Sequence, residues 1–184
     1  MATITGGNTL IDPQIIIKKA NLRASMRVAD LGCGSSGHFV FAIAPFVGKE
    51  GVIYGVDILK SSLAHIRHRA QHENLRQVKT VWSNIEIFKA TDIETASLDV
   101  ALLINVLYQS SKRVDMIREA IRLTKVGGKI VIIDWNNIAT PFGPSIQERV
   151  NKENLLKVAD RLRLNLVEEF KAGQYHFGII FQKL

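Results

Sequence analysis

The chain has 184 residues, of which 47% are hydrophobic and 22% charged, and its formal net charge is +7. This length and composition are typical of one folded domain and exclude a disordered chain. No apolar run approaches the ~20 residues that a membrane-spanning helix needs. The segment Met1–Leu10 also lacks the basic and apolar blocks of a secretory signal.

The single cysteine, Cys33, excludes an internal disulfide and favours a cytoplasmic setting. It lies inside a glycine-rich turn, where a small buried filler is favoured over a reactive thiol. The basic residues are spread along the chain, and their densest stretch, Lys60–Arg76, is predicted to be the solvated face of a helix. The positive charge permits a nucleic acid partner without favouring one.

Helix and strand patterns alternate along the chain. Asp12-Pro13 is an N-cap followed by a proline at the first helical position, which predicts a short helix to about Ala20. Further strands are predicted at Arg27–Leu31, Val52–Val56, Val78–Trp82, Leu98–Ile104 and Lys129–Asp134, and further helices at Gly37–Val47, Leu59–Glu73 and Ser111–Leu123. We expect Lys125–Gly128 to form a glycine turn.

Strands that alternate with helices predict β-α-β units and a parallel sheet. After a predicted helix at Lys152–Arg161, the tail contains two predicted strands, Leu164–Phe170 and Tyr175–Gln182. The short gap between them cannot hold a crossover helix, so the pair must be an antiparallel hairpin. The predicted fold is an α/β, doubly wound, mostly parallel sheet with a C-terminal antiparallel hairpin strand, in a single domain over residues 1–184.

The most informative segment is Val28–Gly37, in which an apolar strand reaches Asp30 and three glycines follow at Gly32, Gly34 and Gly37. Glycines at a strand-to-helix turn let bare backbone approach a ligand, because no Cβ intervenes. Their spacing also matches the Gly-x-Gly-x-x-Gly dinucleotide fingerprint. An NAD-binding oxidoreductase is therefore one alternative function.

The charges favour a different cofactor. Asp30 lies at the end of a predicted strand, where such sheets bind ligands, and its carboxylate would repel a pyrophosphate over the glycine turn. S-adenosylmethionine carries an ammonium and a sulfonium group and no phosphate. Asp57, at the end of the next predicted strand, is suited to accept hydrogen bonds from both ribose hydroxyls. Helix capping is the alternative role for both carboxylates.

The chain resembles the class I (Rossmann-like) S-adenosylmethionine-dependent methyltransferases over nearly its whole length. The resemblance rests on Asp30-x-Gly32-x-Gly34, Gly55-Val56-Asp57-Ile58, Leu103-Ile104-Asn105-Val106-Leu107, the turn Thr124–Lys129 and the hairpin tail. The chain is most similar to the small-molecule type found in ubiquinone and menaquinone biosynthesis. The resemblance implies methyl transfer to a small-molecule acceptor, with an RNA or protein acceptor and a catalytically silent cofactor-binding module as alternatives.

The resemblance assigns cofactor binding to a set of residues at the strand ends. They are Asp30, Gly32, Gly34, Gly37, Asp57, Ile58, Asn84, Ile85 and Asn105. Gly37 comes one place later than the family's usual glycine, which is expected to reshape the turn. Asn84 stands where the family often has Asp for the adenine amine, and its carbonyl can still accept that hydrogen bond. A turn residue and a strand terminator are the alternative roles for Asn84 and Asn105.

Candidates for the acceptor side lie at the carboxyl ends of the later strands. Tyr108, Asp134 and Trp135 are predicted to bind the substrate, and the loop Thr140–Pro144 either borders the pocket or is a plain connector.

The last strand runs antiparallel, so its beginning lies at the same edge and places Tyr175 and His176 near the site. We expect one of them to orient or deprotonate the acceptor, since histidine has an unperturbed pKa near ~6.5. A solvent-facing edge histidine is the alternative. The sequence predicts no metal site and does not indicate the acceptor or the oligomeric state.

Overall fold

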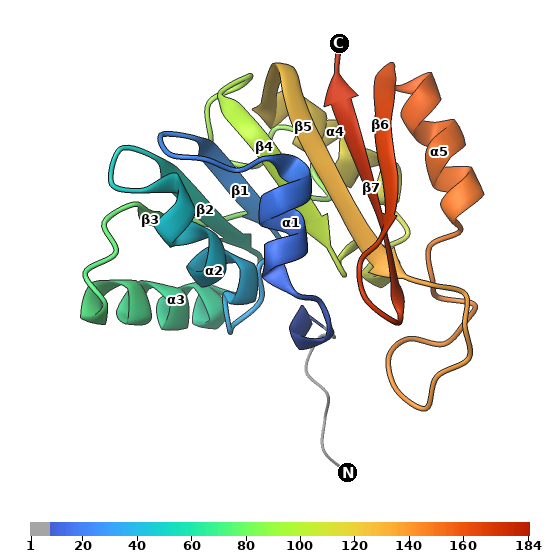
Figure 1. Ribbon diagram of the computed structural model, residues 1–184, viewed down its shortest axis with the longest axis horizontal. Helices are drawn as coiled ribbons and strands as arrows, with labels where there is room; N and C mark the ends of the chain where they lie inside the picture. Colours follow the sequence, from blue (N-terminus) through green and yellow to red (C-terminus); the bar gives the residue numbers. More distant parts are fainter. Residues whose placement is uncertain (1–7) are drawn as a thin grey trace.

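Seven strands form one sheet in the order β3-β2-β1-β4-β5-β7-β6 (Figure 1). The structure is a computed structural model that describes residues 8–184, so most of the segment predicted to lack a secretory signal lies outside the described residues. The strands are β1 (Arg27–Leu31), β2 (Val52–Asp57), β3 (Val78–Trp82), β4 (Leu98–Ile104), β5 (Thr124–Trp135), β6 (Leu164–Lys171) and β7 (His176–Lys183). Only the pairs that include β7 are antiparallel, which confirms the predicted fold class.

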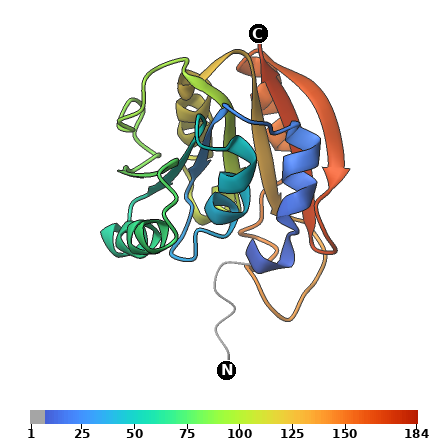
Figure 2. The same cartoon turned by 60° about the vertical axis from the view of Figure 1, so that its left-hand side comes forward.

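Helices cover both faces of the sheet. They are α1 (Pro13–Ala20), α2 (His38–Val47), α3 (Lys60–His72), α4 (Arg113–Leu123) and α5 (Lys152–Arg161), with short 3₁₀ turns η1 (Asn8–Leu10) and η2 (Leu107–Gln109). In Figures 1 and 2, α1 and α2 lie in front of the sheet and α4 lies behind it. Among residues 8–184, no helix is long and apolar enough to cross a membrane.

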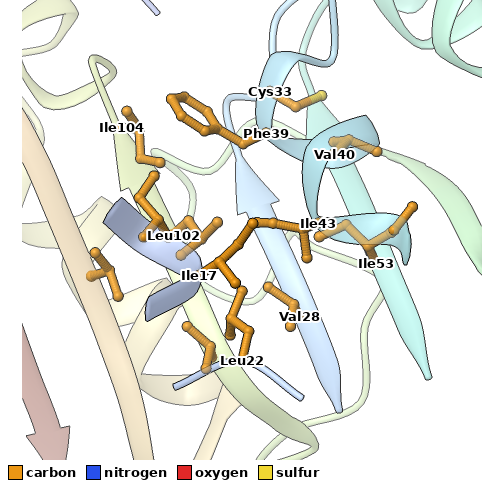
Figure 3. Packing of buried hydrophobic residues seen from close by; sticks show 14 of the residues in the cluster. Ile17, Leu22, Val28, Cys33, Phe39, Val40, Ile43, Ile53, Leu102 and Ile104 are labelled. Atoms are coloured by element: carbon orange, nitrogen blue, oxygen red, sulfur yellow. The ribbon is translucent and has the colours of Figure 1, made fainter. Parts of the chain in front are cut away.

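The hydrophobic core is divided between the two faces of the sheet. Ile17 of α1 and Ile43 of α2 pack on Val28, Ile53 and neighbouring strand residues (Figure 3). The side chains that point to the other face pack against α4 and α5. Because both faces are covered, β1 and β4 are almost entirely buried, as expected for central parallel strands.

The predicted turn Lys125–Gly128 is instead part of β5, and this prediction was wrong. Leu98 pairs with Thr124, but Val100 pairs with Lys129, so β5 carries extra residues at a bulge. Gly127 has φ +77°, a conformation that favours glycine. A glycine cluster therefore interrupts the register without ending the strand.

The carboxyl edge of the sheet gathers the connections that concern function. It lies at the lower side of Figure 1, where residues 136–151 and the turn between β6 and β7 also lie. The strand order reverses between β1 and β4, because the chain passes from β1 to β2 and β3 before it returns to β4. Sheets of this kind bind ligands at such a reversal.

A buried ion pair between Glu119 and Arg122 of α4 fixes the connection between β3 and β4. The Glu119 carboxylate of α4 accepts hydrogen bonds from the backbone N–H groups of Lys89 and Thr91. Arg122 pairs with it at 2.7 Å and donates to the Thr95 hydroxyl. Burial raises the pKa of Glu119, but the hydrogen bonds from Arg122 and the backbone outweigh burial and lower it overall.

Replacing Glu119 with alanine leaves Arg122 and two backbone N–H groups without this acceptor. We expect the free energy of unfolding to fall by about 3–5 kcal/mol, measured by urea unfolding at pH 7. The natural pair's contribution is present above the unfolded pKa of Glu119 and is lost as the pH falls through the lower folded value.

The matched control is Asp115→Ala in the same helix. Asp115 is 41% exposed and pairs with Arg118 at the surface, so its removal should cost less than about 1 kcal/mol. Equal losses in the two variants would contradict the role of the buried pair.

Candidate functional site

The turn after β1 brings its backbone close to the segment after β4. Gly32 has φ +90°, and a Cβ added there would lie 2.5 Å from Cγ2 of Val106. Gly34 has open space where its Cβ would be. Gly37 is the N-cap of α2, and its added Cβ would lie 2.9 Å from the Phe41 ring. The late third glycine is therefore required by packing of the helix.

A cleft of about 410 Å³ opens beside this turn. Six of the residues predicted to bind the cofactor line it, namely Gly32, Gly34, Asp57, Ile58, Asn84 and Ile85. Sequence reasoning missed others, including the buried Ser62 and Ser83. Single serines carry no spacing signal, so only the folded connections place them here.

Asp57 holds the two sides of the cleft together. One carboxylate oxygen accepts from the Gly34 N–H at 2.9 Å, and the other accepts from the Leu59 N–H at 2.8 Å. The second bond is the capping role considered from the sequence. A carboxylate has about four acceptor sites, so both oxygens retain capacity for the hydroxyls of a ligand.

Asp30 of β1 is the second carboxylate near the turn; its side chain is buried and is not among those that line the cleft. Burial, with the charge of Asp57 adding to it, raises the pKa of Asp30 to about 7. Its Oδ2 atom has no hydrogen-bond partner among residues 8–184. A buried carboxylate oxygen without a partner is costly unless a cationic or hydrogen-donating group satisfies it.

Cys33 is also fully buried in the turn. Burial raises the pKa of its thiol far above the ordinary value, and a Cβ added to Gly55 would lie 3.3 Å from its Sγ. The thiol therefore fills a tight space between β1 and β2, as the sequence favours.

The two predicted asparagines differ in position. Asn84 lines the cleft, and its Oδ1 accepts from the Glu86 N–H at 3.0 Å, which is a turn-forming bond. Asn105 does not line the cleft. It follows β4 with φ +51°, donates from Nδ2 to Asn8 Oδ1, and accepts from Gln109 at its carbonyl. The structure thus shows local hydrogen-bonding roles for both asparagines.

The predicted substrate residues lie along the same edge but outside the cleft. Asp134 accepts hydrogen bonds from the N–H groups of Tyr108 and Trp135. Burial raises the pKa of Asp134 to about 7, against the effect of those bonds. Burial also raises the pKa of the Tyr108 hydroxyl, and Asp134 adds to that effect. Asp134 therefore ties the end of β5 to η2.

His176 begins β7 and is fully buried. Its ring lies 4.4 Å from the Trp135 ring, centroid to centroid. Burial, assisted by the charge of Arg149, lowers the pKa of His176 to about 4. The alternative of a solvent-facing histidine was wrong, and so was the expectation of an unperturbed pKa. Tyr175 packs edge-on against Phe142 at 5.0 Å.

Arg149 is a buried residue that the sequence did not single out. Its guanidinium donates to the carbonyl oxygens of Asn136 and Pro144 and to the Thr140 hydroxyl. It also lies 5.6 Å from the centre of the Trp135 ring. No sequence pattern around Arg149 predicts these contacts, because most of its partners are backbone carbonyl groups of a loop without regular structure.

Comparisons with known proteins identify a family that this chain matches. A family model described as "Methyltransferase domain" matches residues 22–175. The uncharacterized methyltransferase YcgJ of Bacillus subtilis is 27% identical over 161 residues, which are 88% of this chain and 60% of YcgJ. An arsenite methyltransferase of Aquipseudomonas alcaligenes is 31% identical over 112 residues, which are 59% of this chain and 32% of that protein.

A demethylmenaquinone methyltransferase of Lactococcus lactis is 23% identical over 126 residues, which are 68% of this chain and 48% of that protein. The chain thus spans between about a third and three fifths of the length of these three relatives.

Solved structures share the fold at low sequence identity. A SAM dependent methyltransferase from Aquifex aeolicus has a TM-score of 0.86 at 19% identity, and the match covers 98% of this chain and 94% of that chain. The [4+2]-cyclase SpnF has a TM-score of 0.77 at 13% identity, covering 93% of this chain and 80% of that chain. The fold alone therefore does not specify a reaction.

The buried Asp30 carboxyl predicts a pH-dependent stability. Folding raises the pKa of Asp30 from 3.8 to about 7, so its stabilising contribution is full below the unfolded pKa and is lost as the pH rises through 7. We expect Asp30→Asn to unfold with a higher free energy than the natural chain at pH 8. Between pH 5 and 8 this difference should grow by roughly 2–3 kcal/mol, measured by denaturant titration.

The control for this measurement is Asp92→Asn, because Asp92 is exposed. Its difference from the natural chain should stay nearly constant over the same pH range. A constant difference for Asp30→Asn as well would contradict the raised pKa.

Proposed function

Since the chain belongs to the methyltransferase domain family, we propose that it transfers a methyl group from S-adenosylmethionine to a small-molecule acceptor. Family membership confirms the resemblance predicted from the motifs, and with it the class of cofactor. Two relatives support a small acceptor, because their names specify arsenite and demethylmenaquinone.

The buried Asp30 carboxylate carries the cofactor assignment. Burial and the charge of nearby Asp57 raise the pKa of Asp30. One oxygen of its carboxylate has no hydrogen-bond partner among the described residues. A pyrophosphate bound near the glycine turn would be repelled by the carboxylates of Asp30 and Asp57. A ligand with fixed positive charge offsets both, so the residues present fit S-adenosylmethionine better than NAD.

The cleft residues supply separate parts of a binding site. We assign the ribose hydroxyls to Asp57, which retains acceptor capacity on both oxygens. Ile58 and Ile85 offer apolar surface for the adenine, and Asn84 lies beside them. Gly34 leaves its backbone open to the ligand, since nothing occupies the position of a Cβ.

The chain's task in such a reaction is alignment and exclusion of water. When bound, the cofactor would supply an activated methyl group on a positively charged sulfur. His176 and Tyr175 stay candidates for orienting the acceptor at the same edge of the sheet. A histidine whose pKa is about 4 is neutral at pH 7, so we propose that His176 acts as a hydrogen-bonding group.

Calorimetric titration with S-adenosylmethionine tests the cofactor site. We expect the natural chain to bind about tenfold more tightly at pH 8 than at pH 6, because Asp30 ionises near pH 7. Asp30→Asn should bind at least about tenfold more weakly at pH 8 and lose most of this dependence. NAD is the control ligand, and binding of NAD without S-adenosylmethionine would reverse the assignment.

A second candidate acceptor is RNA, and one surface favours it. A groove of about 630 Å³ between α3 and β3 is larger than the cofactor cleft and shares no lining residue with it. Its lining includes Arg67, Arg76 and Lys79 and no acidic side chain. None of these three cations forms an ion pair with another described residue. We keep the small molecule as the first proposal, because the groove is separate from the cleft.

A labelled single-stranded RNA, titrated at several salt concentrations, tests this candidate. If RNA binds the groove, Arg76→Glu should weaken binding and reduce the salt slope by about 0.7 or more. Arg161→Glu on α5 is the control with the same charge change. Salt-independent binding, or equal effects of the two variants, removes RNA as a candidate.

A further inference from the structure

We propose that Trp82 is a positioning residue for cofactor binding, because its indole N–H fixes a peptide group that orients the Asp57 carboxylate. The peptide group is the one between Ile58 and Leu59. This inference rests on the proposed function, in which Asp57 binds the ribose hydroxyls. It concerns a residue that does not itself line the cleft.

The peptide group between Ile58 and Leu59 is held at both ends by side chains. Its carbonyl oxygen, which belongs to Ile58, accepts a hydrogen bond from Nε1 of Trp82 at 2.8 Å. Its N–H, which belongs to Leu59, donates to Oδ1 of Asp57 at 2.8 Å. The C=O and N–H of one trans peptide unit are coplanar and point in opposite directions. The two bonds together therefore fix one orientation of the peptide plane.

This peptide group lies outside regular structure, between the end of β2 at Asp57 and the start of α3 at Lys60. Leu59 is the N-cap of α3 and makes no side-chain cap bond. At the start of most helices, a polar side chain at the N-cap fixes the entering chain. Asp57 and Trp82 supply that restraint here, from residues outside the helix.

The same peptide group sets the direction of the Asp57 carboxylate. One carboxylate oxygen is held by the Leu59 N–H and the other by the Gly34 N–H of the glycine turn. If the peptide plane turned over, a carbonyl oxygen would face the carboxylate in place of the N–H and would repel it. Trp82 opposes this rotation, because its N–H would lose its acceptor. The indole thus preserves the direction in which Asp57 presents its remaining acceptor sites to the cleft.

The position of Trp82 favours this role over one in the hydrophobic core. The residue is 54% exposed and ends β3, which is an edge strand of the sheet (Figure 1). It pairs with Asp57 in the register of β2 and β3. The Lys60 ammonium lies 5.4 Å from the centre of its ring. Because a half-exposed ring buries little apolar surface, the hydrogen bond and the contact with Lys60 are its main local interactions.

Amide hydrogen exchange in the cofactor-free chain tests the first step of this argument. Trp82→Phe keeps an aromatic ring and removes the N–H donor. We expect the amides of Leu59 and Gly34 to exchange at least fivefold faster in this variant, measured by NMR at pH 7, because their bonds to Asp57 open more often. Amides within β1 and β4 are the internal reference and should not change. Unchanged exchange at Leu59 overturns the proposal.

Titration calorimetry at pH 8 with S-adenosylhomocysteine and with adenosine tests the effect on the cleft. Trp82→Phe should weaken both ligands by about three- to tenfold, as expected for the loss of one hydrogen bond. The factor should be the same for both, because they share the ribose that Asp57 is proposed to bind. Unchanged affinity for both ligands overturns the proposal.

Trp82→His separates the N–H group from the ring. In histidine, Nε2 occupies the ring position of the indole Nε1 and can carry a proton in the neutral imidazole. This variant should keep more of the affinity for both ligands than Trp82→Phe does, and slower exchange at Leu59. Equal losses in the two variants assign the effect to the ring and overturn the proposal.

Phe88→Leu is the matched control. Phe88 is another half-exposed aromatic residue beside a lysine, Lys89, and its side chain has no hydrogen-bond donor. We expect both affinities and the exchange at Leu59 to stay within twofold of the natural chain. Losses in Phe88→Leu as large as those in Trp82→Phe overturn the proposal, because they indicate a general effect of exposed aromatic residues.

Failure of the proposed function has a different signature. A natural chain that binds neither S-adenosylmethionine nor adenosine lacks the proposed function, and with it a role for Trp82 in cofactor binding. A chain that binds S-adenosylmethionine with the same affinity before and after Trp82→Phe keeps the proposed function and overturns only the role of Trp82.

Discussion

The close approach between the turn after β1 and the segment after β4 is the constraint on which the site depends. Gly32 fits under Val106 only because it has no Cβ. The two segments meet because β1 pairs with β2 on one side and β4 on the other. Successive connections leave this point in different directions, and the cleft opens between them. A side chain at Gly32 would push apart the two segments that form its walls.

The two buried carboxylates of Glu119 and Asp30 have opposite surroundings and opposite pKa shifts. Glu119 is surrounded by donors, whose hydrogen bonds outweigh the effect of burial, lower its pKa and hold a connection in place. Asp30 is buried with one oxygen unpartnered among residues 8–184, so its burial raises the pKa. The first arrangement stabilises the fold, whereas the second reduces stability at the position where a cationic ligand is proposed. Buried ionisable groups with strongly shifted pKa values are concentrated at functional sites.

The edge where we propose that the acceptor binds also contains buried polar groups without partners among the described residues. Trp135 and His176 contribute buried polar atoms that are not satisfied within the described residues. Arg149 closes the adjacent loop with bonds to backbone oxygens, and its charge helps to keep His176 neutral. Burial thus keeps this histidine neutral at pH 7, although an exposed histidine would titrate near that pH.

The sequence by itself determined the fold, the family and six of the fifteen described residues that line the cleft. Alternation of apolar runs fixed the order of the elements, and the short gap before β7 required an antiparallel pair. Glycines and acids at strand ends carry signal because backbone geometry and charge act locally.

Only the tertiary structure decided the rest, because burial and pairing depend on distant parts of the chain. In the folded chain, Lys125–Gly128 is part of β5 and forms a bulge opposite β4. The tertiary structure also buried His176 against Trp135 and brought Arg149 onto a loop that precedes it by several residues. These features set the pKa values and the unpartnered atoms at the site, and no local pattern encodes them.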